Sequence, residues 1–282
     1  MKYRHAFHAG NFADVHKHVT LLALIAALQR KDKGFFYLET HAGRGRYDLD
    51  SADTHQGAEA RLGIGTLSTP GTGRAELDAY VATVTRARAR GGSDSLYPGS
   101  PLLAALTLRP QDRGRCYELQ AAECRALERA LQPYPRMSAE CGDGYAALKS
   151  QLPPAERRAL VFIDPPYEEQ ELEFERATAG IQATLSRLAN AVILLWYPIK
   201  DQRQLGPWLR RLAADLPAPA LTSELWLHPR DSRVGLNGSG LLIVHPPYQF
   251  DEGMRQWLPE LGTALGTGRQ GGTQLTWIAH EH

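Results

Sequence analysis

Acidic residues and glycines follow several apolar runs of strand length, in a pattern suited to binding a nucleotide-like ligand. Gly43 and Gly45 come after the run 34–39, and glycine lets a ligand approach the backbone closely. Glu118 stands near the end of a run at 116–119, where a carboxylate can accept hydrogen bonds from both ribose hydroxyls. Asp143 lies between two glycines after 137–141, placed to accept a hydrogen bond from an adenine amino group.

The most specific motif is Asp-Pro-Pro-Tyr at 164–167, which follows the apolar run 159–163. A second run, 241–244, continues as His-Pro-Pro-Tyr at 245–248, with His245 in place of the acid. A proline pair can therefore simply end a strand. The carboxylate of Asp164 distinguishes the first motif, and Tyr197-Pro198 ends a further run at 191–197.

Strands and helices alternate along the chain, which predicts a mainly parallel, doubly wound α/β sheet. Ligands bind such sheets at the carboxyl ends of the strands, so the segments above should meet at one edge. Further strands are predicted near 221–227 and 241–244, and helices at 12–30, 75–90, 121–131 and 171–188.

The interval between Gly45 and Glu118 is about 50 residues longer than a usual strand-to-strand interval. We therefore predict an N-terminal motif and helix at 1–33, a core at 34–45 and 99–262, a largely helical insertion at 46–98, and a tail at 263–282. We expect the glycine- and threonine-rich tail to be loosely ordered, although 275–278 could add a short strand.

Composition is ordinary for a globular protein: 282 residues, 43% hydrophobic, 22% charged and a formal net charge of +1. It excludes disordered and coiled-coil classes and gives no global sign of a nucleic-acid partner. Basic residues are nevertheless concentrated at 1–46, where eight lysines and arginines stand against three acids. Arginines of the insertion could extend a local phosphate-contacting rim: Arg74, Arg86, Arg88 and Arg90.

Three cysteines without a Cys-x-x-Cys pair argue against a disulfide framework or a zinc ribbon and favour a reducing cytoplasm. The apolar run 19–28 is too short to cross a bilayer, and its flanks do not fit a signal peptide. We therefore expect a cytoplasmic protein that does not bind a membrane. The histidines at 5, 8, 16 and 18 are candidate metal ligands, but His16 and His18 point to different helix faces, so we expect no metal.

Taken together, these motifs resemble the adenosylmethionine-dependent adenine-N6 methyltransferases that carry Asp-Pro-Pro-Tyr. More narrowly, the chain is similar to the bacterial methyltransferase J family, which acts on 23S rRNA. The similarity covers about residues 1–262; His245 departs from the asparagine more common there. It is carried by Tyr3 to Asn11, Ala13-Asp14, Lys17-His18, Thr40 to Tyr47, Tyr97 to Pro101, Glu118, Gly142 to Gly144 and Asp164 to Glu168.

The resemblance implies a Rossmann-like class I methyltransferase fold with a seven-stranded, mainly parallel sheet and S-adenosyl-L-methionine as cofactor. It implies a catalytic role for Asp164, to which the chemistry of the reaction adds Pro165 and Tyr167. Residues near the RNA would be Tyr3, Arg4, Lys17 and Tyr167. Cofactor contacts would be His18, His41, Gly43, Ser100, Glu118, Asp143, Gly144 and Asp164.

The chemistry of methyl transfer to an exocyclic amine agrees with these roles. The amine is a poor nucleophile because its lone pair is delocalised into the ring. Asp164 and the Pro165 carbonyl can accept its two N–H bonds as positive charge develops, and Tyr167 can offer a face for an extruded base.

Two other functions remain open on the sequence. A DNA adenine-N6 methyltransferase would share Asp-Pro-Pro-Tyr, and a non-catalytic RNA-binding or ribosome-assembly protein could keep the same scaffold. A nicotinamide-dependent enzyme is disfavoured because the turn lacks the third glycine of its motif. We expect a monomer acting on one adenine of protein-free or early-assembly 23S rRNA.

Overall fold

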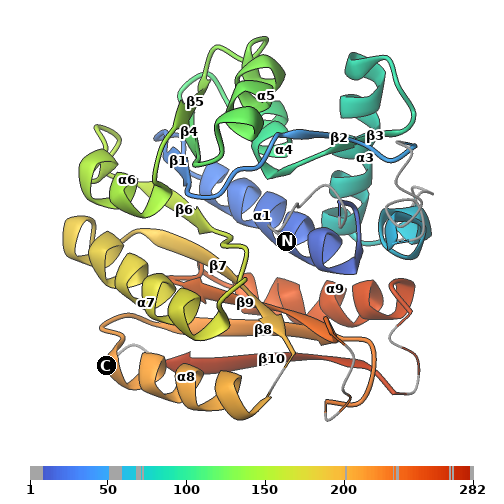
Figure 1. Cartoon of the computed structure of the whole chain (residues 1–282), viewed down its shortest axis with the longest axis vertical. Helices are drawn as coiled ribbons and strands as arrows, with labels where there is room; N and C mark the ends of the chain where they lie inside the picture. The colour runs from blue at the N-terminus through green and yellow to red at the C-terminus, as the bar shows by residue number, and fades with distance from the viewer. Residues whose placement is uncertain are drawn as a thin grey trace.

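Helices cover both faces of one large twisted sheet (Figure 1). The computed structural model describes residues 9–50, 59–67, 71, 73–200, 202–230, 232, 235–266, 268 and 270–279. No helix in these ranges is long and apolar enough to cross a membrane.

The sheet has eight strands in the order β10-β8-β9-β7-β6-β1-β4-β5, one more than the seven predicted. The strands β5, β4, β1, β6 and β7 run parallel, whereas β9 is antiparallel to both β7 and β8. The central strands are buried along their whole length, as expected for strands covered on both faces. Their bounds are β1 Phe36–Glu39, β4 Arg113–Glu118, β5 Met137–Cys141, β6 Ala159–Ile163, β7 Val192–Ile199, β8 Ala220–Trp226 and β9 Gly238–Val244.

The helices form two layers. α6, α7 and α8 cover one face, and α1, α4, α5 and α9 cover the other. Asn11 begins α1 by accepting hydrogen bonds from the N–H groups of Ala13 and Asp14, which is the usual way to satisfy the first turn of a helix. The bounds are α1 Phe12–Gln29, α4 Ser100–Thr107, α5 Ala121–Leu131, α6 Gly144–Gln151, α7 Gln170–Arg187, α8 Gln202–Asp215 and α9 Phe250–Ala264.

The segment 46–98 leaves the sheet after β1 and returns before α4. Its described part holds the 3-10 helix η2 (Ile64–Leu67) and the helix α3 (Ala75–Gly91), which packs on α1. It also contains a short antiparallel pair, β2 (Arg46–Asp48) and β3 (Leu96–Pro98), which the sequence analysis did not predict. This pair brings the two ends of the segment together beside the ligand edge of the sheet.

The prediction of a loosely ordered tail is wrong for residues 272–279, where a strand longer than the one allowed at 275–278 is formed. Residues Gly272–Ala279 form β10, an antiparallel edge strand on β8. Trp277 is only partly buried there, and its ring N–H donates to Asp251 of α9 at 3.2 Å. The glycine-rich composition concealed a strand that is stabilised by pairing with β8 and by contact with α8 and α9.

The cysteine pattern argued against a disulfide framework, but the structure joins one pair, Cys124 and Cys141. Cys124 lies in the first turns of α5 and Cys141 ends β5, so tertiary packing brings together two residues 17 positions apart. Cys116 is a free, buried cysteine in β4.

Candidate active site

The segments that follow β1, β4, β5 and β6 meet at one edge of the sheet and are joined by backbone hydrogen bonds. The N–H of Thr40 donates to the carbonyl of Phe162 in β6 (3.0 Å), and Ala42 donates to Tyr117 in β4 (2.9 Å). Gly142, after β5, donates to the carbonyl of Glu118 (3.1 Å). Parallel strands place their carboxyl ends together, so motifs from distant parts of the chain form one site.

The glycine turn and Glu118 are in direct contact. Glu118 Oε2 accepts from the N–H of Gly43 (2.9 Å), and Oε1 accepts from the N–H of Gln120 (2.7 Å). Gly43 has a φ of +61°, and a Cβ there would lie 2.4 Å from the Tyr47 hydroxyl, so a side chain is excluded. Burial raises the pKa of Glu118 above its usual value. The carboxylate is thus fixed in orientation at this edge of the sheet.

Asp143 begins α6. Its Oδ1 accepts from the N–H groups of Tyr145 (2.8 Å) and Ala146 (3.3 Å), so both capping bonds use the same oxygen. A Cβ on Gly144 would lie 2.0 Å from the carbonyl oxygen of Thr40. The start of α6 therefore packs directly against the segment after β1.

Asp164 is held by a buried lysine. Lys17 Nζ lies 2.7 Å from Asp164 Oδ2 and 3.0 Å from Asp14 Oδ1, and it also lies over the Trp196 ring at 4.9 Å. Lys17 is 3% exposed. We predicted that Lys17 contacts RNA; the structure instead places its ammonium between two carboxylates.

Tyr167 does not offer the open ring face that we predicted for a target base. Its ring is 3% exposed and packs edge-on against Phe174 and Trp196. Its hydroxyl donates to the Trp196 carbonyl at 2.9 Å. Its φ of +48° is unusual for a non-glycine residue and occurs where the surroundings impose it. Tyr167 therefore anchors the turn that contains Asp164 and Pro165.

The remaining predicted cofactor residues are His41, in the segment after β1, and His18 and Ser100, on α1 and α4. His41 Nδ1 is 2.7 Å from the Thr40 hydroxyl, and burial lowers the pKa of His41 to about 4. His18 lies beneath the insertion, with Nδ1 2.8 Å from the Tyr97 hydroxyl and its ring stacked on Tyr97. Ser100 begins α4, and its hydroxyl donates to Glu39 at 2.5 Å.

Glu39 is the principal site residue that sequence reasoning missed. It ends β1, is fully buried, and accepts further hydrogen bonds from the Tyr37 hydroxyl (2.8 Å) and the Cys116 thiol (3.5 Å). Burial raises the pKa of Glu39 to about 7, and the nearby charge of Asp164 acts in the same direction. The available signal was an acid that ends an apolar run immediately before the glycine turn.

Strand direction explains why the second Pro-Pro-Tyr motif is not part of this site. β9 runs antiparallel to β7, so its carboxyl end lies at the opposite edge of the sheet from Asp164. His245 adopts a φ of +50°, and its Nδ1 lies 3.2 Å from the Ala191 carbonyl, which precedes β7. Asparagine and histidine tolerate this backbone conformation better than most residues.

Tyr197-Pro198 and His16, which the sequence singled out, form internal contacts of the fold. Four further predicted residues lie outside the described ranges. β7 continues through Tyr197-Pro198 to Ile199, and the buried Tyr197 hydroxyl donates to Glu224. His16 bonds to Ser223 (2.9 Å) and Ser239 (3.0 Å), and burial lowers its pKa to about 3. Residues outside the description are Tyr3, Arg4, His5 and His8.

A cavity of about 330 Å³ lies beside the glycine turn. Arg44 forms two hydrogen bonds with Glu123, at 2.9 and 3.0 Å, whereas Arg46 and Arg129 are exposed. The cavity is lined by Arg44, Arg46, Ala126, Arg129 and Ala130. Its guanidinium groups suit an anionic ligand such as a phosphate.

The site as a whole suits a positively charged nucleoside ligand. Carboxylates from β4, the α6 start and β6 converge on the edge, and the glycine turn leaves its backbone close to that edge. Negative charge fixed near a developing or permanent cation stabilises it most where water is excluded.

Comparison with known proteins identifies a family. Residues 32–279 match the family model described as "Ribosomal RNA large subunit methyltransferase D, RlmJ", so the match extends past the limit of 262 that we predicted. Proteins named ribosomal RNA large subunit methyltransferase J from Escherichia coli K12 and Haemophilus influenzae are 37% and 34% identical over 281 residues, covering 100% of this chain and of each relative. A crystal structure from Legionella pneumophila superposes with a TM-score of 0.85 at 34% identity, covering 96% of this chain and 98% of that one.

Proposed function

The chain belongs to the ribosomal RNA large subunit methyltransferase J family, and we propose that it transfers a methyl group from S-adenosylmethionine to the N6 amine of one adenine in 23S rRNA. It is a large-subunit rRNA methyltransferase of the mixed α/β, Rossmann-like type. To this family assignment the proposal adds adenine as the target base, N6 as the methylated atom, S-adenosylmethionine as the methyl donor and the residues that bind and catalyse.

The cofactor site is proposed at the ends of β1, β4 and β5. Glu118 is oriented by Gly43 and Gln120 to accept from the ribose hydroxyls, and Asp143 accepts from the adenine amino group. Gly43 fits this role through its φ of +61°, which side-chain-bearing residues rarely adopt, and Gly144 through the close approach of the Thr40 backbone. Ser100, His41 and His18 complete the expected contacts. The cofactor supplies an electrophilic methyl group on a positively charged sulfur.

The single observation that carries the catalytic proposal is the pairing of Asp164 with a buried lysine at the end of β6. Lys17 occupies Oδ2 of Asp164, which fixes the carboxylate and leaves Oδ1 for the substrate amine. The Pro165 carbonyl accepts the second N–H, and Tyr167 holds the turn through its bond to Trp196. Most of the rate enhancement then comes from positioning and from stabilising positive charge on the amine.

The substrate is proposed to be protein-free or early-assembly 23S rRNA, bound by a monomer in the cytoplasm. The described part of the basic rim includes the arginine-lined cavity beside the glycine turn. Tyr3 belongs to the same proposal through the resemblance, and Arg4 through the basic N-terminal segment.

The test is to compare Asp164→Asn with the unaltered protein, using protein-free 23S rRNA and labelled S-adenosylmethionine. Asparagine keeps the shape of the side chain but replaces one acceptor oxygen, so kcat should fall by at least about two orders of magnitude. The Kd for the cofactor, measured by calorimetry, should stay within about threefold because Glu118, rather than Asp164, is proposed to bind the ribose hydroxyls.

Glu118→Ala is the complementary variant, and it should mainly weaken cofactor binding. Near-full activity of Asp164→Asn would contradict the catalytic role, and unchanged cofactor binding by Glu118→Ala would remove Glu118 from the site. Methyl incorporation into duplex DNA rather than rRNA would favour a DNA methyltransferase, and failure to bind the cofactor would favour a non-catalytic RNA-binding protein.

A further inference from the structure

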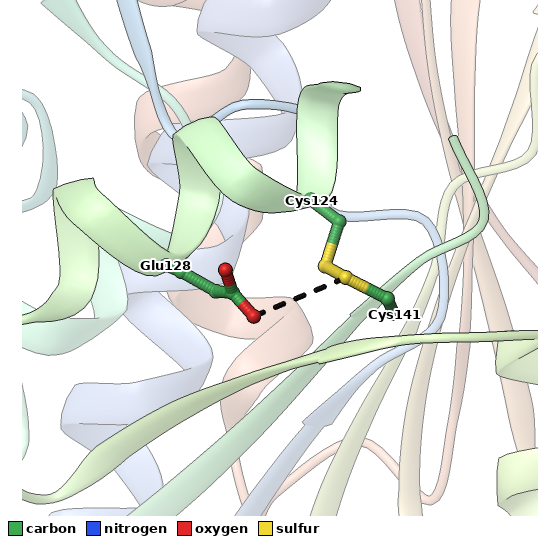
Figure 2. A group of neighbouring side chains, drawn as sticks. All are labelled: Cys124, Glu128 and Cys141. Atoms are coloured by element: carbon green, nitrogen blue, oxygen red, sulfur yellow. Dashed lines mark hydrogen bonds between the residues drawn. A yellow bond between two sulfur atoms is a disulfide. The ribbon is translucent and has the colours of Figure 1, made fainter. Parts of the chain in front are cut away.

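The disulfide between α5 and β5 joins two segments that each lead directly to a proposed cofactor carboxylate. Figure 2 shows Cys124 on the helix, Cys141 at the strand end and the Glu128 side chain beside them. The Cα atoms of the two cysteines are 5.5 Å apart, within the range that a disulfide requires. Nothing in the methylation chemistry uses these residues.

Cys124 is one helical turn from the group that orients Glu118. The N–H of Cys124 donates to the carbonyl of Gln120 (2.9 Å), and the N–H of Gln120 donates to Glu118 Oε1 (2.7 Å). The first turn of α5 therefore connects the sulfur of Cys124 to the proposed ribose-binding carboxylate.

Cys141 is two residues before Asp143. Gly142, between them, donates its N–H to the carbonyl of Glu118 (3.1 Å), and Asp143 caps α6. A change in the position of Cys141 therefore reaches both proposed cofactor carboxylates.

Among the strands that the structure describes, β5 lies at the edge of the sheet and is hydrogen-bonded to β4. The disulfide gives its carboxyl end a second attachment, to the helix that covers it. Cys141 is exposed whereas Cys124 is fully buried, so thiol–disulfide exchange has access to the bond through Cys141.

We propose that Cys124 and Cys141 form a reversible, redox-sensitive crosslink that sets the affinity of the enzyme for S-adenosylmethionine. The inference rests on the cofactor site proposed above. The oxidant is a small disulfide such as oxidised glutathione: two protein thiols and one glutathione disulfide give one protein disulfide and two glutathione thiols. Oxidation fixes the segments that carry Glu118 and Asp143 relative to each other. Reduction gives the end of β5 more freedom, which must be lost again when the cofactor binds.

The experiment measures cofactor binding by the full-length protein in two redox states. The protein is equilibrated in oxidised or reduced glutathione, and alkylation with mass spectrometry counts one free thiol in the crosslinked form and three in the reduced form. Calorimetry with S-adenosylmethionine should give a Kd about three- to tenfold higher for the reduced form, the usual scale of a preorganisation effect.

Cys124→Ser and Cys141→Ser are matched variants, because both remove the crosslink but one lies in the core and the other on the surface. Both should bind like the reduced protein in either buffer. Equal Kd values for the two redox states of the unaltered protein would overturn the proposal. It would also be overturned if glutathione buffers produced no crosslink and the reduced protein instead held one zinc ion through Cys124, Glu128 and Cys141. If neither redox state binds S-adenosylmethionine while the crosslink still forms, the proposed cofactor site is wrong rather than the redox chemistry.

Discussion

A buried ammonium group is stable only when its charge is compensated, and Lys17 shows how this site achieves it. Its two carboxylate partners come from different segments: Asp14 lies one turn earlier on α1, and Asp164 follows β6. Asp14 is itself held by the N–H of Gly10 at 2.9 Å. The position of the proposed catalytic carboxylate, Asp164, thus depends on a helix that precedes the whole sheet in sequence.

Replacing Lys17 with methionine should reduce both stability and activity. Removing one partner of a buried ion pair leaves uncompensated charge, which costs about 3 kcal/mol of unfolding free energy, and Asp164 loses the contact that fixes Oδ2. We expect kcat to fall by about 100-fold or more, with cofactor affinity nearly unchanged. Lys31→Met, at an exposed lysine just after α1, is the control and should behave like the unaltered protein. Wild-type kcat in Lys17→Met would remove Lys17 from the mechanism.

Glu39 makes stability depend on pH in a direction opposite to that of most carboxylates. Its pKa of about 7 in the folded protein is above its ordinary 4.5. Between these values the unfolded chain loses the proton and the folded chain keeps it, so stability is full below pH 4.5 and falls as pH rises to about 7.

The glutamine of Glu39→Gln cannot ionise, so this variant should not lose stability as the pH rises. Between pH 5 and pH 8 the unaltered protein should therefore lose about 2–3 kcal/mol of unfolding free energy that the variant does not lose. Urea unfolding at the two pH values measures the change. Parallel pH curves for the two proteins would show that Glu39 does not titrate in this range.

At the scale of secondary-structure elements, α6 and the segment after β1 are packed with no space between their backbones. Gly144→Ala would bring a Cβ to 2.0 Å from the Thr40 carbonyl. We expect a loss of about 1–3 kcal/mol of unfolding free energy and a clear rise in the Kd for S-adenosylmethionine. Gly142→Ala is the matched control two residues earlier, because the nearest atom to a Cβ there is 3.9 Å away. If both variants behave alike in thermal unfolding, the tight packing at Gly144 has no energetic importance.

Elements with strong local patterns were predicted well from the sequence. The strands β5 and β6 and the helix α5 have the bounds that were predicted for them. β10 was anticipated only as a possible short strand at 275–278, because its full length is stabilised by pairing with β8, a distant segment. β2 and β3 were missed because each has three residues and they pair across the whole insertion.

The site was predicted as a set of strand ends but not as a set of contacts. Asp164, Glu118 and Asp143 follow runs whose direction the α/β alternation predicts. The buried states of Lys17 and Tyr167 depend on packing between α1, β6 and β7, which no local spacing encodes. Cys124 and Cys141 likewise come together only through the packing of α5 on β5.

At the scale of the whole molecule, a net charge of +1 conceals a local basic surface. Arg46 and Arg129 line the cavity beside the glycine turn and are both exposed. If they contact rRNA phosphates, the Arg46→Ala/Arg129→Ala double variant should bind rRNA more weakly. The slope of log K against log salt should also decrease by about 0.7–0.9 per lost phosphate contact. Filter binding at several salt concentrations measures both quantities.

Arg210→Ala/Arg211→Ala is a suitable control, because it removes two exposed arginines from α8 on the opposite layer. This control should keep the wild-type slope. Equal slopes for both double variants would exclude the cavity as a phosphate site.

Glu39, at the end of β1, should also make cofactor binding depend on pH. With a pKa of about 7, Glu39 carries a proton in about half of the molecules near neutral pH. A cationic cofactor bound beside Ser100 would favour the ionised form, so we expect each binding event to expel a fraction of a proton into the buffer. The heat of binding should then vary with the ionisation enthalpy of the buffer, and methyl-donor capture by this enzyme should strengthen as the surroundings become more alkaline.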